Sequence, residues 1–128
     1  MIRALLIQPE PLNKILAGTK IWEIRGSQTK IRETIGLVPS RSGTVVAICD
    51  LIDCIGPLNQ REFHANTAKA GMRPDQAKLG YYLQTYAWVL ANVRLLKKPV
   101  PYIHPSGAVI WVNLAENTES AVRRQIPK

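Results

Sequence analysis

The sequence has few residues of the kinds that bind metals or form disulfides. It contains 2 cysteines, 2 histidines and no CxxC pair. Cys49 and Cys54 lie in one expected strand, where about 16 Å would separate their Cα atoms, whereas a disulfide needs about 7 Å or less. We therefore expect two reduced thiols, no metal site and no cofactor.

The sequence also lacks a segment that predicts export or membrane insertion. Its N-terminal apolar run covers residues 4–7 only. A signal peptide needs roughly 7–15 apolar residues and a membrane-spanning helix roughly 20. Repeats and low-complexity segments are absent as well. These absences predict a soluble cytoplasmic protein that has no membrane partner.

Acidic residues are scarce, because 9 Asp and Glu stand against 17 Lys and Arg, for a formal net charge of +8 and a pI near 9.9. With 128 residues, 46% of them apolar, the chain fits one globular domain and excludes the disordered, collagen-like, coiled-coil and disulfide-rich classes. The positive charge fits nucleic acid, an anionic membrane surface or an acidic protein. Most of the excess falls in residues 65–128, which carry 9 basic and 3 acidic side chains.

Hydrophobic periodicity predicts short strands with helices inserted early and in the middle of the chain. Residues 9–18 predict a helix, because Pro9 and Pro11 suit a first turn and Gly18 suits a left-handed end. A second helix is expected at residues 58–71, with a loop or short helix at 72–82. Strands are expected at residues 3–8, 20–25, 34–38, 45–55, 86–96 and 109–114, with a proline-rich connection at 97–107.

Several of these strands are apolar on both faces, which is typical of a barrel core covered outside by helices. The fold class predicted is therefore α+β, a small mixed β-barrel of five or six strands with two or three short helices. We assign residues 1–114 to this domain. Residues 115–128 form a polar basic tail in this interpretation, with a weak helix and frayed last residues.

One motif follows the first expected helix directly: Gly18-x-Lys20-x-x-Glu23-x-Arg25. Downstream come an aromatic strand, a Pro-x-Pro turn, a glycine and a last strand with a tryptophan: Trp88, Pro99–Tyr102, Gly107 and Trp111. In motif, order and ending, residues 2–114 resemble the ASCH domain, a PUA-like barrel family. The resemblance implies a PUA-like fold and RNA or a modified nucleobase as ligand.

The resemblance also limits which activity can be carried over. Some small bacterial ASCH proteins are amidohydrolases of N4-acetylcytidine, with a Lys base and a Thr nucleophile in the motif and a Glu acid in the middle helix. Here Glu23 stands at the Thr position and has no hydroxyl, and the acid position falls near Ala68. Because other ASCH proteins are described as ribonucleases, an RNA-processing hydrolase with Lys20 and Glu23 as catalytic residues stays open.

The motif offers chemistry for a nucleotide. Glu23 and Arg25 share one strand face, with Cα atoms roughly 6.5–7 Å apart. Arg25 can hold a phosphate bidentately, Lys20 can act as a point charge, and Glu23 can accept the amino group of a base such as cytosine. In the alternative interpretation, Glu23 and Arg25 form only a structural salt bridge.

Two further segments are candidates for ligand binding. Ser40 and Arg41 begin a Ser-Arg-Ser-Gly turn, whose backbone N–H groups form either an anion nest or a solvated turn. Trp88 is a stacking platform if one face opens onto the cleft and a core residue otherwise, whereas Trp22 is expected in the core.

We therefore favour a module that binds RNA, a nucleotide or a modified nucleobase through Lys20, Glu23 and Arg25. An RNA-processing hydrolase, either a ribonuclease or similar to the nucleoside amidohydrolases, is the alternative. A module that binds an acidic protein partner is the third hypothesis.

Overall fold

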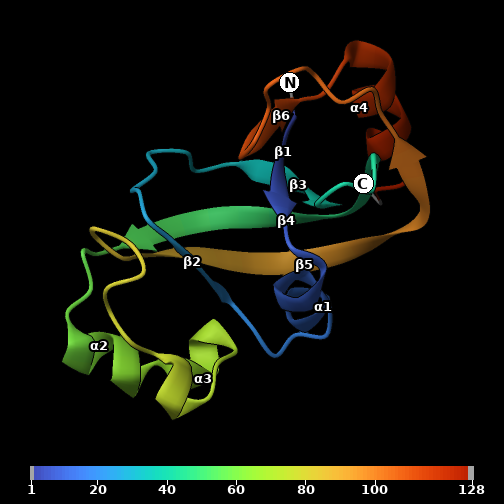
Figure 1. Ribbon diagram of the computed structural model, residues 1–128. Coiled ribbons are helices and arrows are strands. Elements are labelled where there is room, and N and C mark those ends of the chain that lie inside the picture. Colours follow the sequence, from blue (N-terminus) through green and yellow to red (C-terminus); the bar gives the residue numbers. More distant parts are fainter. Residues whose placement is uncertain (1, 127–128) are drawn as a thin grey trace.

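The computed structural model describes residues 2–126 and shows one mixed six-stranded sheet surrounded by short helices (Figure 1). The strands are β1 (Arg3–Ile7), β2 (Trp22–Arg25), β3 (Thr34–Pro39), β4 (Thr44–Ile55), β5 (Tyr86–Pro101) and β6 (Trp111–Asn113). The α-helices of this part of the chain are α1 (Pro9–Leu16), α2 (Gln60–Ala65), α3 (Thr67–Ala70) and α4 (Glu116–Arg123), and a 3₁₀ turn, η1 (Pro74–Gln76), follows α3. The α+β class is confirmed, with four short α-helices in the described residues where the sequence predicts two or three.

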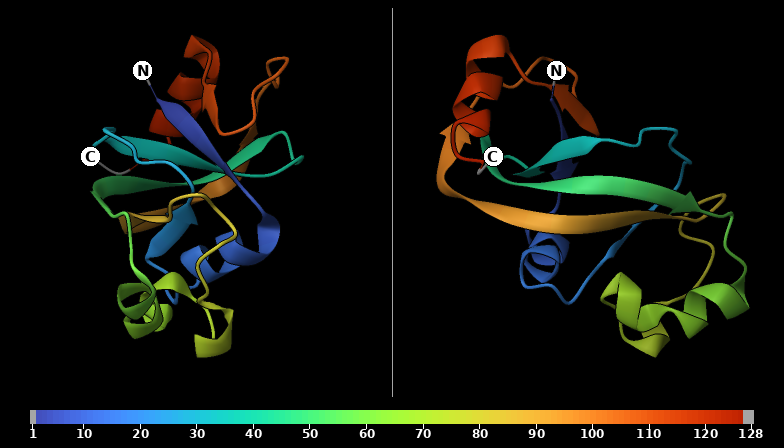
Figure 2. Two further views of the ribbon diagram at one scale, coloured as in Figure 1. Left: turned by 60° about the vertical axis from the view of Figure 1, so that its left-hand side comes forward. Right: turned by 180° about the vertical axis from the view of Figure 1, so that it is seen from behind.

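The sheet is curved but not closed. Its strand order is β2-β5-β4-β3-β1-β6, with β1 parallel to β3 and the other pairs antiparallel. Strands β2 and β6 are the two edges, so within residues 2–126 the sheet forms a half-barrel with an open side. Strands β4 and β5 run its whole length, from the α2–α3 end to the α4 end (Figure 2).

Irregular pairing between the two long strands supplies the curvature. Their register shifts at three places, between Val45 and Ala47, between Ile48 and Asp50, and between Leu51 and Asp53. In β5, Asn92 has a left-handed φ of 54° and donates its side-chain amide to Asp50 at 2.8 Å. Bulges of this kind bend a strand and increase its twist.

Strand β5 continues to Pro101, so the prediction of a proline-rich connection starting at Lys97 is wrong. Strand β2 pairs with only the first four residues of β5, which leaves the rest of β5 as an edge on that side. Tyr102 donates its backbone N–H to Gly43 at 3.0 Å. Backbone N–H groups point to alternate sides along a strand, so the nitrogens of Pro99 and Pro101 point toward the open edge. A missing N–H there removes no hydrogen bond between strands.

Other boundaries shift for local reasons. The single helix expected at residues 58–71 is two helices, because the backbone leaves the helical region at Asn66, where φ is −120°. Asn59 and Glu62 form a capping box that starts α2. Strand β6 begins at Trp111, two residues later than the sequence predicts. Gly18, with φ of 82°, follows the end of α1 as expected.

Three apolar clusters hold the elements together. The first packs α1 against one face of the sheet, the second packs α4 against the opposite face, and the third places α2 and α3 over β2 and the start of β5. In α4, Val122 is completely buried in the second cluster. Trp22 is buried in the third cluster, as predicted. The division into residues 1–114 and a tail stays a prediction, and the fraying expected at residues 127–128 lies outside the described residues.

Both cysteines are free, as predicted. Cys49 is completely buried, and burial raises the pKa of its thiol to about 12. None of the helices in residues 2–126 has the length and apolar character needed to cross a bilayer.

Candidate functional site

The open side of the half-barrel is bridged by side chains rather than by a strand pair. Arg25, on edge strand β2, donates an N–H to the backbone carbonyl of Leu6 on β1 at 2.8 Å. Beside this bridge, Trp88 of β5 stacks on Trp111 of β6, with ring centroids 5.8 Å apart and planes 14° apart. These contacts join both ends of the sheet and leave a hollow between β1 and β2.

This hollow is a cleft of about 310 Å³, called here the central cleft. Its residues come from β1, α1, β2, the β3–β4 turn and four other connections: Leu6, Gln8, Pro11, Lys20, Glu23, Ile24, Arg25, Ser40, Met72, Tyr82 and Val109. All three polar residues of the sequence motif therefore line one cavity. Of the described residues that line it, Glu23 alone carries a carboxylate.

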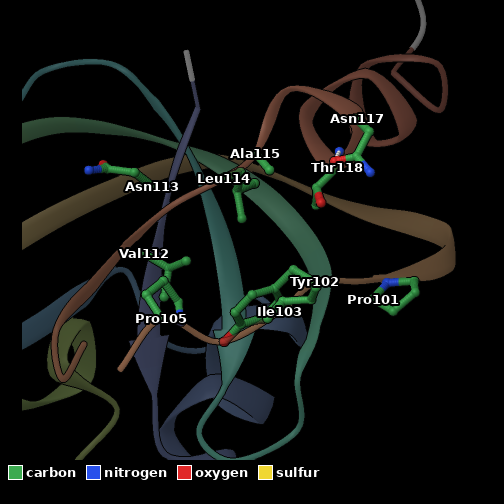
Figure 3. A pocket seen from close by; sticks show the side chains of 10 residues that line it. All are labelled: Pro101, Tyr102, Ile103, Pro105, Val112, Asn113, Leu114, Ala115, Asn117 and Thr118. Atoms are coloured by element: carbon green, nitrogen blue, oxygen red, sulfur yellow. Dashed lines mark hydrogen bonds between the residues drawn. The ribbon is translucent and has the colours of Figure 1, made fainter. Parts of the chain in front are cut away.

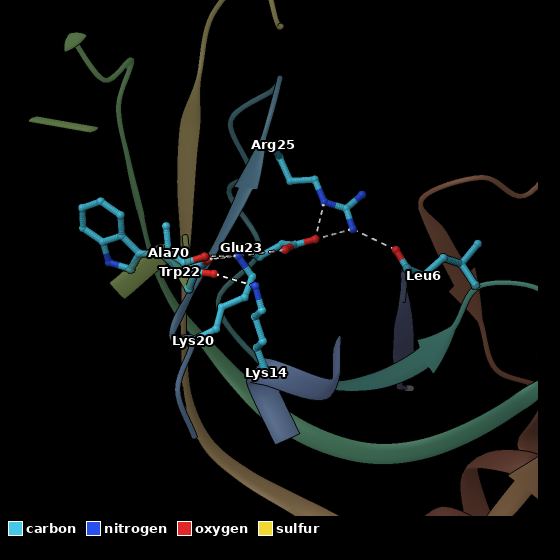
Figure 4. A network of polar contacts seen from close by, with 8 residues as sticks. Leu6, Lys14, Lys20, Trp22, Glu23, Arg25 and Ala70 are labelled. Carbon is cyan, nitrogen blue, oxygen red and sulfur yellow. Dashed lines mark hydrogen bonds and ion pairs between the residues drawn. The ribbon is translucent and has the colours of Figure 1, made fainter. Parts of the chain in front are cut away.

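Glu23 lies between two cations at the floor of the central cleft (Figure 4). Its Oε2 accepts from Nε of Arg25 at 3.1 Å and lies 3.0 Å from Nη2, while Oε1 lies 3.6 Å from Nζ of Lys20. The side chain of Glu23 is only 9% exposed. The expected salt bridge is thus present, but it lies in a cavity wall, where a buried pair is screened less than a surface pair.

Arg25 is held in place on three sides. Glu23 and the Leu6 carbonyl bind its Nε and Nη2, and its guanidinium carbon lies 5.6 Å from the ring centroid of Trp88. Nη1 makes no hydrogen bond to any described residue, and Figure 4 shows it pointing away from both acceptors. Arg25 therefore presents free donors from a fixed position.

Lys20 is buried, with only 4% of its surface exposed, although the sequence predicts that it offers a charge to a phosphate. Its Nζ donates to the carbonyls of Trp22 at 2.6 Å and Ala70 at 2.8 Å. With Glu23 nearby, the three donors of the ammonium group have three acceptors around them. Lys20 thus ties β2 to the end of α3 and fixes one oxygen of Glu23.

Burial also sets the protonation behaviour of Lys20. Desolvation lowers its pKa below the usual value, the charge of Glu23 opposes this shift, and Lys14 and Arg25 add to it. Gly71 adopts a φ of 66° directly over the lysine stem, where a Cβ would lie 2.9 Å from Cβ of Lys20. A glycine at this position is what lets the chain after α3 cover the lysine.

The remaining predicted residues lie in different places. Trp88 is 2% exposed, donates its indole N–H to Ser27 at 2.8 Å, and is covered by Trp111 and Arg25. In this arrangement the ring supports Arg25 and has no free face for a base. Ser40 lines the central cleft, where it adjoins a further cavity lined by Arg41.

The Ser-Arg-Ser-Gly turn is a tight β-hairpin whose N–H groups are partly used. Ser40 donates its backbone N–H to Ile7 at 2.8 Å, and Ser42 donates to Pro39 at 3.0 Å. Arg41 sits at its tip with φ of 68°. Two of the backbone N–H groups of the turn are therefore already used within the fold, and the choice between an anion nest and a solvated turn stays a prediction.

Sequence reasoning missed the loop residues of the cleft. Met72 and Tyr82 come from the two ends of the loop between α3 and β5, and Val109 comes from the loop before β6. The ring of Tyr82 packs against Gly26, where a Cβ would lie 2.5 Å from the nearest ring carbon. No periodicity marks these residues, because loop positions depend on how distant elements pack.

A larger cavity of about 450 Å³ lies elsewhere, between the segment after β5 and the start of α4 (Figure 3). None of the residues found to line it is charged; they include Tyr102, Ile103, Asn113 and Asn117. Among residues 2–126, no three His, Cys, Asp or Glu side chains are grouped to hold a metal ion. The central cleft differs from this cavity in that Lys20, Glu23 and Arg25 of the sequence motif all line it.

The fold and the site together define a class: a small basic half-barrel whose open side holds a charged, ligand-sized cleft. Residues 5–100 match the ASCH domain, so the chain belongs to the ASCH domain family. Comparison with curated proteins gives no match.

Solved structures with the same fold come from Zymomonas mobilis. Its ASCH protein has a TM-score of 0.72 and 13% identity, over 95% of this chain and 93% of that one. A Tyr-to-Phe variant has a TM-score of 0.71 and 14% identity, over 95% and 96% of the two chains. A Ser-to-Ala variant has a TM-score of 0.66 and 14% identity, over 95% and 94%. At such identities the likeness establishes the fold alone.

Proposed function

We propose that this protein binds RNA or a modified nucleobase in the central cleft. The observation that carries the proposal is Arg25, which Glu23, the Leu6 carbonyl and the Trp88 ring hold in one position while Nη1 has no hydrogen-bond partner among residues 2–126. A donor that is fixed before binding loses little conformational freedom when the ligand arrives.

The two residues at the cleft floor divide the recognition. Nη1 of Arg25 donates a hydrogen bond to a phosphate oxygen or to a carbonyl of the base. The positive charge of the guanidinium strengthens this hydrogen bond. Glu23 keeps lone pairs beyond those used by Lys20 and Arg25, and these accept an exocyclic amino group such as that of cytosine. Lys20 acts through Glu23 as a positioning residue.

The charge of the whole chain supports a polyanionic ligand. The formal net charge is +8, with 17 Lys and Arg against 9 Asp and Glu. Contacts between basic side chains and phosphates hold RNA without reading its sequence, and they weaken as the salt concentration rises. The cleft then supplies the base contact.

The test compares RNA binding by the wild type, Arg25→Gln and Arg25→Lys in about 100 mM salt. We expect Arg25→Gln to weaken binding by about 1–3 kcal/mol and Arg25→Lys to recover part of it, because lysine keeps the charge but not the fork of donors. Arg124→Gln is the matched control, since Arg124 is exposed on the chain just after α4. Equal binding by all four folded proteins would refute the proposal.

A hydrolase that processes RNA is the second candidate. The observation that favours it is the lowered pKa of Lys20 beside the Glu23 carboxylate in a cleft, a combination that is frequent at catalytic sites. Glu23 would act as acid or base, and Lys20 would stabilise developing negative charge after leaving its carbonyl partners. Product formation from an RNA and nucleoside panel, abolished in Glu23→Gln while RNA binding persists, would establish it.

A further inference from the structure

Three further cavities share walls with the central cleft. One, of about 230 Å³, shares Pro11, Lys20 and Met72 with it, and none of the described residues that line it is aromatic. The other two are larger. The tyrosine cavity, about 380 Å³, shares Ile24, Met72 and Tyr82 with it and adds Lys78 and Tyr81. The hairpin cavity, about 510 Å³, shares residues with the opposite side of the cleft and adds Arg41 and His104. The shared residues on that side are Leu6, Gln8, Ser40 and Val109.

The tyrosine cavity, the central cleft and the hairpin cavity form a row of three cavities, and each of them is lined by a solvent-accessible cation. Lys78 lines the tyrosine cavity, Arg25 the central cleft and Arg41 the hairpin cavity. A strand of linked phosphates matches such a row, because each added nucleotide brings one negative charge. A lone nucleobase or nucleoside would use only the central cleft.

Exposed aromatic and apolar side chains border the row. Tyr81 is 88% exposed and meets Tyr82 edge-on, with ring centroids 4.8 Å apart. Tyr82 is itself fixed on Gly26, so the pair is anchored at the boundary between two cavities. On the other side, Val109 is 77% exposed at the boundary with the hairpin cavity. Exposed aromatic rings beside cations are what unpaired bases stack on.

The hairpin cavity also has an ordered wall. His104 bonds to the Ala108 carbonyl through Nε2 at 2.9 Å and to the Tyr102 hydroxyl through Nδ1 at 3.1 Å. Because Nε2–H must donate to the carbonyl, neutral His104 accepts from Tyr102 at Nδ1. This pair fixes the loop before β6, so Arg41 faces a preformed wall.

We propose that the three cavities are a groove for single-stranded RNA with three nucleotide subsites. The central cleft takes one base, Tyr81 stacks the base on one side, and Arg41 holds the phosphate on the other. The inference rests on the proposed function, since it extends the same site, and it identifies an unpaired strand as the ligand.

The test measures binding of cytidine 5′-monophosphate and of labelled oligocytidylates of two to six nucleotides. We expect affinity to rise with each nucleotide up to three and then level off. Tyr81→Ala should weaken trinucleotide binding by about 5- to 150-fold, the range of one base stack, while Tyr81→Phe keeps it. Lys78→Gln and Arg41→Gln should each lower the salt slope for the trinucleotide by about 0.7 and leave the mononucleotide unchanged.

The outcomes separate this inference from the proposed function. Affinity that does not depend on length, with Arg25→Gln still defective, overturns the groove and keeps the central cleft as a nucleobase site. Lys78→Gln and Arg41→Gln variants that both behave like Arg124→Gln also overturn it. A wild type that binds no strand of any length overturns the proposed function and the groove together.

Discussion

Glu23 is the residue whose replacement tests the site most directly. The Glu23→Gln variant keeps the shape of the side chain and removes the charge that lies 3.6 Å from Lys20 and 3.0 Å from Arg25. At an effective dielectric constant of about 20, each of these attractions amounts to about 5 kcal/mol before desolvation is subtracted. Removing one partner from a buried ionic group costs about 3–5 kcal/mol, because the other charges stay buried.

The measurement is the free energy of unfolding in urea at neutral pH, with thermal melting as a second readout. For a domain of this size, a loss of 3–5 kcal/mol corresponds to a melting point lower by roughly 10–20 °C. Glu33→Gln is the matched control, because Glu33 pairs with Arg3 at 3.3 Å with side chains 35% and 38% exposed. Such an exposed pair contributes about 1 kcal/mol or less.

A double-mutant cycle separates the charge from the side chain's other contacts. Lys20→Met removes one of the two cations, so the double variant with Glu23→Gln should be less destabilised than the sum of the two single variants by about 2–3 kcal/mol. If the effects add within about 0.5 kcal/mol, Glu23 and Lys20 are not coupled and our account of the site is wrong.

Two more predictions concern stability. Burial raises the pKa of Cys49 to about 12, so between about pH 9 and 12 the folded state keeps a proton that the unfolded state loses. The protonated thiol therefore contributes fully to stability below about pH 9, and this contribution is lost as the pH rises to 12. We measure the free energy of unfolding in urea at several pH values between 9 and 12. With rising pH it should fall less steeply in Cys49→Ala than in the wild type, by up to about 1.4 kcal/mol per pH unit. Parallel curves for the two proteins would contradict this prediction. Gly71→Ala should cost clearly more than Gly43→Ala, because both glycines have φ near 66° but only Gly71 would press a Cβ onto Lys20. We expect about 1–2 kcal/mol for Gly43→Ala from backbone strain alone, and equal losses for both variants would refute the contact with Lys20.

Local pattern in the sequence was sufficient to place the motif. The two prolines and Gly18 bound α1, and alternation puts Glu23 and Arg25 on one face of β2 with Trp22 on the other. These features depend on residues a few positions apart, whose geometry follows from the backbone repeat. The family resemblance and the α+β class follow from the order of such segments.

The packing of distant segments decided what the motif does. Lys20 becomes a buried tie because Ala70, 50 residues away, supplies a carbonyl, and Arg25 is fixed by Leu6, 19 residues before it. The same packing buries Trp88 and allows β5 to continue past Pro99 to Pro101. Spacing along a chain carries no information on such contacts, because they depend on how the sheet curves and where its open side lies.

The sequence by itself therefore determined the charge, the motif and the strand face that carries it. Only the tertiary structure decided that Arg25 offers free donors to the central cleft whereas the donors of Lys20 are engaged within the fold. It also decided that Tyr81 and Arg41 line cavities that adjoin the central cleft. The physical reason is that side-chain direction is set locally, whereas burial and access are set by the whole sheet.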